Sequence, residues 1–347
     1  MTMARAEDWR SRGGYFSWQP AAGDASPVEV FHVELGDPGA PVLLLVHGWP
    51  TSSIDWSGVA DPLSERFRVC ALDFPGYGFS GKPRGWGYSL TRDAELLEFY
   101  LSQVLGAGAG VIVAHDRGDS VALVHAARYA EGRAATRPEH LVLSNGNIFL
   151  PLSNLTQAQR HMLGTRSWSQ IAAAVTPAAL AEGLGATTFT PPRQAGDPEV
   201  QALTVTFAHG DGIAVLHETI QYLAERSEHE HEWLTALASA PFPVTLMWGL
   251  CDTVSPPRVA SYVWNRYLML KPGANRLYFI PDANHYLQAD RPGAFVSALL
   301  HALGPAGRHG PGPLGPEPGA PLLVDTSREQ LPAAADLLRA PQPADPA

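Results

Sequence analysis

Several features that would point to other classes of protein are missing from this chain. It has only two cysteines among 347 residues and no C-x-x-C pair, so neither a disulfide framework nor a thiol redox motif is expected. Cys70 and Cys251 lie at or beside apolar, strand-like runs, which predicts two buried, reduced thiols, as suits a cytoplasmic protein. The net charge is −10 and no basic block occurs, so nucleic acid is not expected as a partner.

Long apolar stretches are missing too. No apolar run approaches the roughly 18 residues that a membrane-spanning helix needs. Residues 1–20 also lack the apolar core of a signal peptide. We therefore expect no membrane span.

Residue types that bind metals are present, but not in a metal-binding pattern. The run Glu228-His229-Glu230-His231-Glu232 alternates acidic residues and histidines, and alternate positions on a helix point to different sides. His217-Glu218 has no second histidine to complete H-E-x-x-H. The run is interpreted as a solvated helix face, and neither a metal nor an organic cofactor is expected.

Length and composition predict one large core with an insertion. The chain is 45% hydrophobic, which is typical of a globular protein of this size. The expected segments are an N-terminal extension (1–27), the first part of an α/β core (28–146), a helical cap (147–240), the second part of the core (241–303) and a Pro/Gly-rich, disordered tail (304–347). Helices are expected at 156–161, 169–184 and 211–238, a loop at 190–198, and a short helix at 328–338.

The most informative stretch runs from a β-branched segment, 111–113, into an apolar helix-forming segment. Between them stand Ala114, His115, Asp116, Arg117 and Gly118. Small residues two positions before and after Asp116 suit the tight strand-to-helix turn called a nucleophile elbow. No serine occupies its tip, which disfavours a serine esterase. A carboxylate there would attack an electrophilic sp³ carbon and form an alkyl ester. The alternative is an aspartate that caps an ordinary helix.

Two further polar residues follow predicted strands downstream. The apolar run 243–249 precedes a turn that carries Asp252, and the run 276–281 precedes a loop that presents His285. Asp252 would orient the imidazole, and His285 would activate water. Each residue alone could be an ordinary turn or loop residue, but nucleophile, acid and histidine in this order are typical of the α/β-hydrolases.

A fourth element lies upstream of the elbow. The apolar run 42–46 reads as a central parallel strand and ends in His47-Gly48-Trp49-Pro50. In the α/β-hydrolase fold, the loop after this strand supplies one backbone N–H of the oxyanion hole, and the residue after the nucleophile supplies the other. Those donors would be Trp49 and Arg117. The Trp49-Pro50 bond is a candidate cis peptide, and His47 is a candidate to line the substrate site.

With these residues in place, segment 28–303 resembles the α/β-hydrolase group that contains epoxide hydrolases and haloalkane dehalogenases. Within that group it resembles the mesoderm-specific transcript protein-like hydrolases, through residues 47–56, 143–149 and the pattern His115-Asp116-x-Gly118-Asp119. The resemblance implies an α/β-hydrolase fold with a mostly parallel, doubly wound sheet and an inserted helical cap. It implies a hydrolase, without a defined substrate.

The resemblance also helps to distinguish a halide from an epoxide oxygen as the leaving group, because the related enzymes bind the two with different residues. Dehalogenases of this group hold halide with a tryptophan after the nucleophile and an asparagine or second tryptophan, whereas Arg117 and Trp49 stand at the corresponding positions here. Fluoroacetate dehalogenases pair the Asp-Arg sequence with a second arginine, where this chain has Ser120. Epoxide hydrolases use cap phenols to protonate the epoxide oxygen, and Tyr222 and His161 fall near those positions.

The leading hypothesis is therefore hydrolysis of an epoxide to a diol through an ester on Asp116, with a small hydrophobic substrate and water as the reactants. Tyr222 would protonate the epoxide oxygen, unless it is a helix tyrosine that packs on the core with its hydroxyl in water. The first alternative is hydrolysis of a carbon–halogen bond. The second is a ligand-binding α/β-hydrolase relative with little turnover.

Overall fold

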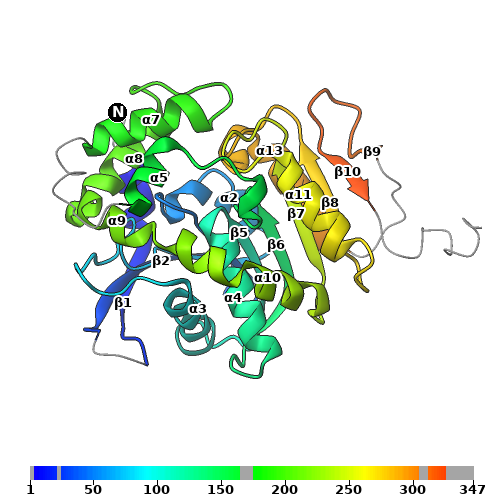
Figure 1. Ribbon diagram of the computed structural model, residues 1–347, viewed down its shortest axis with the longest axis horizontal. Helices are drawn as coiled ribbons and strands as arrows, with labels where there is room; N and C mark the ends of the chain where they lie inside the picture. Colours follow the sequence, from blue (N-terminus) through cyan, green and yellow to red (C-terminus); the bar gives the residue numbers. More distant parts are fainter. Residues whose placement is uncertain (1–3, 22–24, 165–174, 305–311, 326–347) are drawn as a thin grey trace, which may run out of the picture.

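The computed structural model describes residues 4–21, 25–164, 175–304 and 312–325. One sheet of ten strands runs through the molecule, in the order β1-β2-β4-β3-β5-β6-β7-β8-β10-β9 (Figure 1). Its centre is parallel, from β4 to β8, and its two margins are antiparallel. This is the predicted mostly parallel sheet.

The six central strands are β3 (Val42–Val46), β4 (Arg68–Leu72), β5 (Ala109–His115), β6 (Arg137–Ser144), β7 (Val244–Gly249) and β8 (Arg276–Ile280). Four of the six, β3, β5, β7 and β8, contain the apolar runs predicted above. Every residue of β3 and β7 is buried, as expected for parallel strands covered on both faces. The carboxyl ends of these strands meet at one edge of the sheet, where the loops that carry the candidate residues begin.

Helices cover both faces, which confirms the doubly wound architecture. Along β3, Leu44 packs into one apolar cluster while Leu43 and Leu45 pack into the other, because successive side chains of a strand point to opposite faces. The first cluster contains α3 (Leu90–Phe99) with its π-helical extension (Tyr100–Val104), α4 (Arg117–Ala130), α11 (Pro257–Val263) and a π-helical turn (Trp264–Leu268). The second contains a 3₁₀ turn (Ser53–Trp56), α2 (Ala60–Ser64), α12 (Leu287–Asp290) and α13 (Pro292–Leu303).

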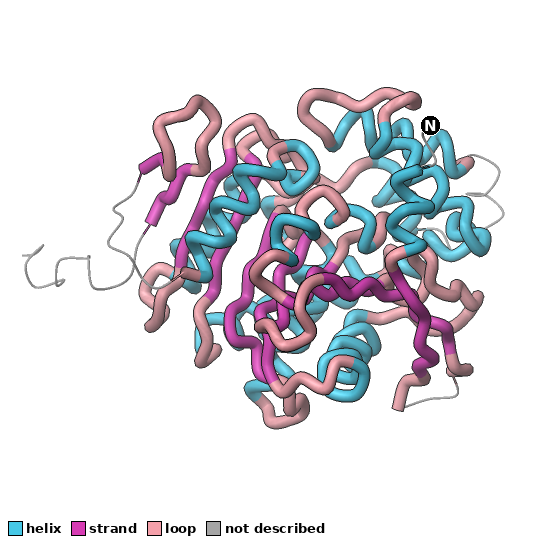
Figure 2. The backbone as a smooth tube through the Cα atoms, turned by 180° about the vertical axis from the view of Figure 1, so that it is seen from behind, coloured by secondary structure: helices cyan, strands magenta, loops and turns pink. Residues whose placement is uncertain are grey.

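Both ends of the chain contribute more to the sheet than expected. In the segment predicted to be an extension, α1 (Ala4–Ser11) packs Trp9 into the core and β1 (Gly13–Trp18) pairs with β2 (Val28–Leu35). At the other end, β10 (Leu322–Asp325) pairs with β8 and with β9 (Gly312–Pro313) (Figure 2). The expectation that the whole tail does not pack is therefore wrong for residues 312–325. The helix expected at 328–338 lies outside the described residues.

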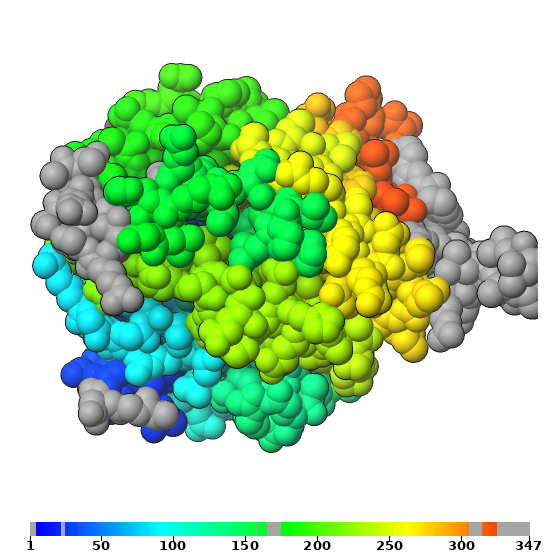
Figure 3. Space-filling view, viewed as in Figure 1, coloured from blue at the N-terminus to red at the C-terminus, as the bar shows by residue number. Residues whose placement is uncertain are grey.

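Residues 147–240, called the insertion below, lie between β6 and β7, and their described parts, 147–164 and 175–240, are largely helical. They comprise a 3₁₀ turn (Leu150–Leu152), α5 (Gln157–Gly164), α7 (Pro177–Thr188), α8 (Pro198–Ala208), a 3₁₀ segment (His209–Val215), α9 (Leu216–Thr219) and α10 (Tyr222–Ser239). Figure 3 shows these residues, in green, covering the side in view between the cyan and the yellow parts of the core.

Three local expectations for the insertion and the cysteines need correction. The helix predicted at 211–238 is divided into a 3₁₀ segment, α9 and α10, with a turn at residues 220–221 between the last two. Helix α8 was not predicted. Cys70 is buried as expected, but Cys251 is exposed, because it lies in the turn after β7 rather than in the strand.

None of the helices in the described ranges combines the length and the apolar character that crossing a bilayer requires.

Candidate active site

The strand-to-helix turn between β5 and α4 places Asp116 at its tip in a constrained conformation. Its φ is 53°, a region that costs a non-glycine residue roughly 1–3 kcal/mol and that is often kept at functional sites. The turn is tight: a Cβ at Gly118 would lie 2.5 Å from the carbonyl oxygen of Val46, and a Cβ at Gly48 would lie 2.6 Å from Cβ of Asp116. Glycine at both positions therefore lets the loop after β3 approach the elbow.

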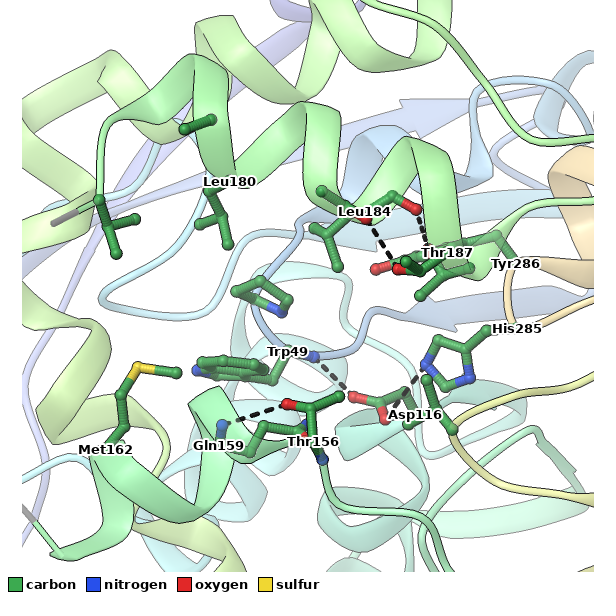
Figure 4. A pocket seen from close by; sticks show the side chains of 16 residues that line it. Trp49, Asp116, Thr156, Gln159, Met162, Leu180, Leu184, Thr187, His285 and Tyr286 are labelled. Atoms are coloured by element: carbon green, nitrogen blue, oxygen red, sulfur yellow. Dashed lines mark hydrogen bonds and ion pairs between the residues drawn. The ribbon is translucent and has the colours of Figure 1, made fainter.

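The two carboxylate oxygens of Asp116 face different groups (Figure 4). Oδ1 accepts a hydrogen bond from the backbone N–H of Trp49 at 2.8 Å, and Oδ2 lies 3.4 Å from Nε2 of His285. Burial alone would raise the pKa of Asp116, but the hydrogen bond and the charge of His285, helped by the Trp49 N–H, outweigh it and hold the pKa below its usual value. The carboxyl group is therefore ionised at neutral pH.

His285 joins Asp116 to Asp252. Its Nδ1 lies 3.2 Å from both carboxylate oxygens of Asp252, whose Oδ1 also accepts the N–H groups of Val254 at 2.8 Å and Ser255 at 3.0 Å. Burial lowers the pKa of His285, but the two carboxylates more than compensate and raise it to about 10. Burial raises the pKa of Asp252, against the opposing effect of His285 and the two amides. The structure thus brings together all three residues predicted as nucleophile, base and orienting acid.

A side chain outside this trio fixes the loop that presents the histidine. Nδ2 of Asn145 donates to the carbonyl oxygens of Asn284 at 2.8 Å and of His285 at 2.7 Å, and its Oδ1 accepts the N–H of Gly249 at 2.9 Å. Nε2 of His115 lies 2.8 Å from the same His285 carbonyl oxygen. Asn145 therefore joins the ends of β6 and β7 to the histidine loop.

Arg117 has its backbone at the first position of α4, directly after the elbow, while its side chain runs into the core. The guanidinium forms an ion pair with Asp93 in which both side chains are almost fully buried. It also lies over the rings of Phe74, Tyr77 and Tyr222, at 5.1 to 5.5 Å from their centres. The side chain of Arg117 therefore packs in the core. The group of Arg117 that was predicted to act in the oxyanion hole is its backbone N–H, and the side-chain contacts leave that prediction unaffected. The predicted cis bond between Trp49 and Pro50 is confirmed.

Three residues predicted to contact substrate are placed elsewhere. His47 is fully buried, with Nδ1 2.8 Å from the carbonyl oxygen of Gly48 and Nε2 accepting the N–H of Phe74 at 3.1 Å. Burial lowers its pKa to about 3, so it is a neutral brace between two loops. The expectation that His47 lines the site is therefore wrong. His161 is exposed on α5 and does not line the pocket, because Gln159 and Met162 occupy the face of α5 that does.

Tyr222 is buried at the start of α10 against the Arg117 guanidinium, and it is not among the residues that line the pocket. Burial raises its pKa well above the usual value, and the negative charge of Asp116 raises it further. The phenol therefore keeps its proton at neutral pH and lies within electrostatic reach of the elbow.

A pocket of about 340 Å³ opens above Asp116 and His285. Core loops form its floor and the insertion forms its walls. The lining is mainly apolar or uncharged and consists of Trp49, Pro50, Asp116, Thr156, Gln159, Met162, Val175, Ala179, Leu180, Gly183, Leu184, Thr187, Thr188, Val254, His285 and Tyr286. Its size and composition suit a small hydrophobic ligand with a reactive group held at the polar end.

Sequence reasoning missed two buried residues next to the site. Asp93, the partner of Arg117, lies on α3, and no local pattern distinguishes it from a surface carboxylate. Arg226 on α10 is fully buried and donates to the carbonyl oxygens of Asn147 and Ile148 and to Oγ of Ser120, at 2.7 to 2.8 Å. Such pairings join segments far apart in the chain. Among the residues that the structure describes, no group of three His, Cys, Asp or Glu side chains could hold a metal ion.

Comparison with known proteins places the chain in a family. The α/β hydrolase fold family matches residues 41–292. LipZ of Mycobacterium tuberculosis is 33% identical over 303 residues, which cover 87% of this chain and 99% of LipZ. The human mesoderm-specific transcript homolog protein is 29% identical, covering 84% of this chain and 86% of its own length. Haloalkane dehalogenase 2 of Mycobacterium bovis is 25% identical, covering 81% and 93%.

A solved α/β hydrolase fold protein from Burkholderia ambifaria superposes with a TM-score of 0.65 at 25% identity, covering 83% of this chain and 99% of that protein. The chain therefore belongs to the α/β-hydrolase fold family, and it is an enzyme of the α/β-hydrolase type.

Proposed function

We propose that this enzyme hydrolyses epoxides to diols through a covalent alkyl ester on Asp116. The observation that carries the proposal is the orientation of the Asp116 carboxylate. One oxygen, Oδ1, already accepts an oxyanion-type hydrogen bond from Trp49, while the other, Oδ2, faces His285 across 3.4 Å. An ionised, buried carboxylate in this position is a nucleophile with its companion oxygen held in place.

In the first step, Oδ2 of Asp116 attacks an epoxide carbon. The carbon–oxygen bond of the ring breaks, its electron pair stays on the epoxide oxygen, and that oxygen takes a proton. Tyr222 is the proposed proton donor, since its raised pKa keeps the phenol protonated. Because Tyr222 does not line the pocket, the proposal passes the proton to the epoxide oxygen through one bridging water. The product of this step is a hydroxyalkyl ester of Asp116.

In the second step, His285 takes a proton from water, and the resulting hydroxide adds to the carbonyl carbon of the ester. The negative charge develops on Oδ1, where the N–H groups of Trp49 and Arg117 would stabilise it. The intermediate then expels the alkoxide of the diol, which takes the proton back from His285, and the carboxylate of Asp116 is restored. Loss of one such donor typically raises the barrier by roughly 2.7–4 kcal/mol.

The charges around His285 suit this order of steps. In the resting site the carboxylates of Asp252 and Asp116 raise the pKa of His285 to about 10, so the imidazole is protonated at neutral pH. Ester formation removes the negative charge of Asp116, which is one of the two charges that stabilise the proton on His285. The pKa of His285 therefore falls, the imidazolium releases its proton to water, and the neutral ring can act as the base of the second step while Asp252 keeps it oriented.

Dehalogenation through the same ester is the second candidate, and the similarity to haloalkane dehalogenase 2 supports it. The contacts favour the epoxide. The indole N–H of Trp49, the obvious halide donor, already donates to Oγ1 of Thr219 at 3.1 Å. The Arg117 guanidinium is paired with Asp93. An epoxide oxygen needs a proton rather than a pair of N–H donors. Epoxide opening therefore does not require the Trp49 indole or the Arg117 guanidinium to give up its present partner.

Intact-protein mass spectrometry of the His285→Gln variant tests the proposal. The variant is incubated with a pool of alkyl and aryl epoxides and, separately, with a pool of haloalkanes, beside the Asp116→Asn variant. We expect an epoxide-sized adduct on Asp116 of the first variant and none on the second. An adduct from the haloalkane pool alone would replace epoxide hydrolysis by dehalogenation. Stoichiometric binding without an adduct or a product would favour the ligand-binding alternative.

A further inference from the structure

The pocket continues beyond Asp116 and His285 as a trough that runs along α7. The lining residues of this helix recur every three or four positions, from Ala179 to Thr188, so they form one stripe of the helix surface. The stripe begins far from the elbow and ends beside His285, whose N–H donates to the carbonyl oxygen of Thr188 at 3.1 Å. In Figure 4, Leu180, Leu184 and Thr187 follow one another toward His285. The nine residue steps from Ala179 to Thr188 make this stripe roughly 13 Å long.

Among the described residues that line the trough, charge is confined to its reactive end. Asp116 and His285 carry it, and the other described lining residues are uncharged. The polar side chains on α7 are already used, because the hydroxyl groups of Thr187 and Thr188 donate to the carbonyl oxygens of Gly183 and Leu184. A substrate carboxylate or ammonium would therefore lose its water here without gaining a partner, which is costly. The trough selects for uncharged chains.

On the opposite wall, Thr156 and Gln159 satisfy each other. Each side-chain oxygen accepts the backbone N–H of the other residue, at 3.1 and 2.8 Å. Met162 continues this wall as a buried, flexible apolar side chain. Both walls therefore offer mainly apolar contact, and the side-chain oxygens of Thr156 and Gln159 already accept hydrogen bonds.

Gly183 stands in the middle of the stripe and leaves it open. A Cβ built there meets no atom of the described residues within 4 Å, so a larger side chain has room to extend among them. Glycine inside a helix costs roughly 0.5–1 kcal/mol relative to alanine, and here it keeps the trough wide at mid-length. The volume of about 340 Å³ matches roughly eleven non-hydrogen atoms at the 30 Å³ that a water occupies in the liquid.

We infer that the substrate carries its electrophilic carbon at the end of an unbranched, uncharged apolar chain, which lies along α7, and that Gly183 sets the chain length the enzyme accepts. This inference rests on the proposed function for the reactive end. It assigns long-chain terminal epoxides as the preferred class and makes Gly183 a residue that determines specificity.

The test uses a homologous series of terminal epoxides of linear alkanes, from short to long, with wild-type enzyme and the Gly183→Leu variant. We expect kcat/KM to rise with chain length in the wild type. The leucine should lower kcat/KM for the long members by about tenfold or more and leave the shortest nearly unchanged. The matched control is Ala186→Leu, on the exposed side of the same helix and outside the lining, which should follow the wild-type profile.

Calorimetric titration of both proteins with the corresponding linear terminal diols separates the two proposals, because binding of a product needs no chemistry. Chain-length-dependent diol binding that the leucine shortens, without any epoxide turnover, would support the trough while overturning the proposed reaction. Turnover or diol binding that does not depend on chain length would overturn the trough. An equal loss for all lengths in Gly183→Leu, or the same shift in Ala186→Leu, would also overturn it.

Discussion

The α/β core and the insertion build opposite sides of one pocket, and they satisfy their polar groups in different ways. In the core, hydrogen bonds join residues far apart in the sequence, such as Trp49 to Asp116 and Asn145 to His285. On α7 and α5 the polar side chains bond within three or four residues, as Thr188 does with Leu184. The core thus fixes reactive atoms relative to one another, whereas these walls of the insertion provide shape. Reaction type should depend on the core and substrate range on the insertion.

The largest expected effect comes from the elbow. Asp116→Asn keeps an oxygen for the Trp49 N–H but removes the charge and the nucleophile, so we expect turnover to fall by about 10⁴-fold or more. Steady-state kinetics measure the loss, and thermal unfolding checks that the fold is kept. If the variant retained more than about a hundredth of wild-type turnover, Asp116 would not be the nucleophile.

The buried ion pair behind the elbow tests whether the core depends on long-range pairing. Arg117→Met leaves the Asp93 carboxylate buried without its partner, and we expect the free energy of unfolding to fall by about 3–5 kcal/mol. The double variant Arg117→Met, Asp93→Leu should recover most of that loss, because it removes both charges. Urea unfolding measures both values. A double variant no more stable than the single one would show that the pairing is not the source of the effect.

The positive charge of His285, which lies in the core part of the site, predicts that the free energy of unfolding depends on pH. Its folded pKa of about 10 exceeds the ordinary value of 6.5, so the interaction contributes stability fully below pH 6.5 and loses it as the pH rises through about 10. His285→Gln lacks this contribution. The difference in unfolding free energy between wild type and variant should therefore shrink between those two pKa values, as followed by urea unfolding at successive pH. A difference that stays constant would contradict the protonated resting state.

The smallest expected effect lies in the insertion. His161 is exposed on α5 and outside the pocket, so His161→Ala should change kcat/KM by about twofold or less, since surface substitutions usually alter free energies by roughly 0.5 kcal/mol or less. Kinetics with the preferred epoxide measure it. A loss of tenfold or more would return His161 to the list of substrate contacts and would weaken the separation between core chemistry and insertion shape.

The same separation explains what the sequence could predict. Asp116, Asp252 and His285 each follow an apolar strand of the parallel sheet, and the carboxyl ends of parallel strands meet at one edge. Local pattern and strand direction were therefore enough to bring them together. The hydrogen bond from the Trp49 N–H to Asp116 follows for the same reason, since Trp49 lies in the loop that begins where β3 ends.

Predicting which residues of the insertion line the pocket required information on packing, which the local sequence does not contain. On α5, Met162 lines the pocket and His161 does not, although they are adjacent, because one residue rotates the helix by about 100° and only packing fixes the face. Helix α8 contains β-branched residues such as Val200, Val205 and Thr206, which weaken a helical pattern. Strand β10 is a short apolar run within a Pro/Gly-rich tail, and the composition of the tail concealed it.

The central claim, that Asp116 carries the substrate as an ester, is tested most directly by a single turnover in H₂¹⁸O with enzyme in excess over a long-chain terminal epoxide. Because water attacks the ester carbonyl, the oxygen that the substrate gains comes from Asp116. The account predicts a diol without ¹⁸O from this first turnover and a peptide containing Asp116 that has gained the label. Label in the diol, with Asp116 unlabelled, would mean direct attack of water on the substrate and would contradict the account.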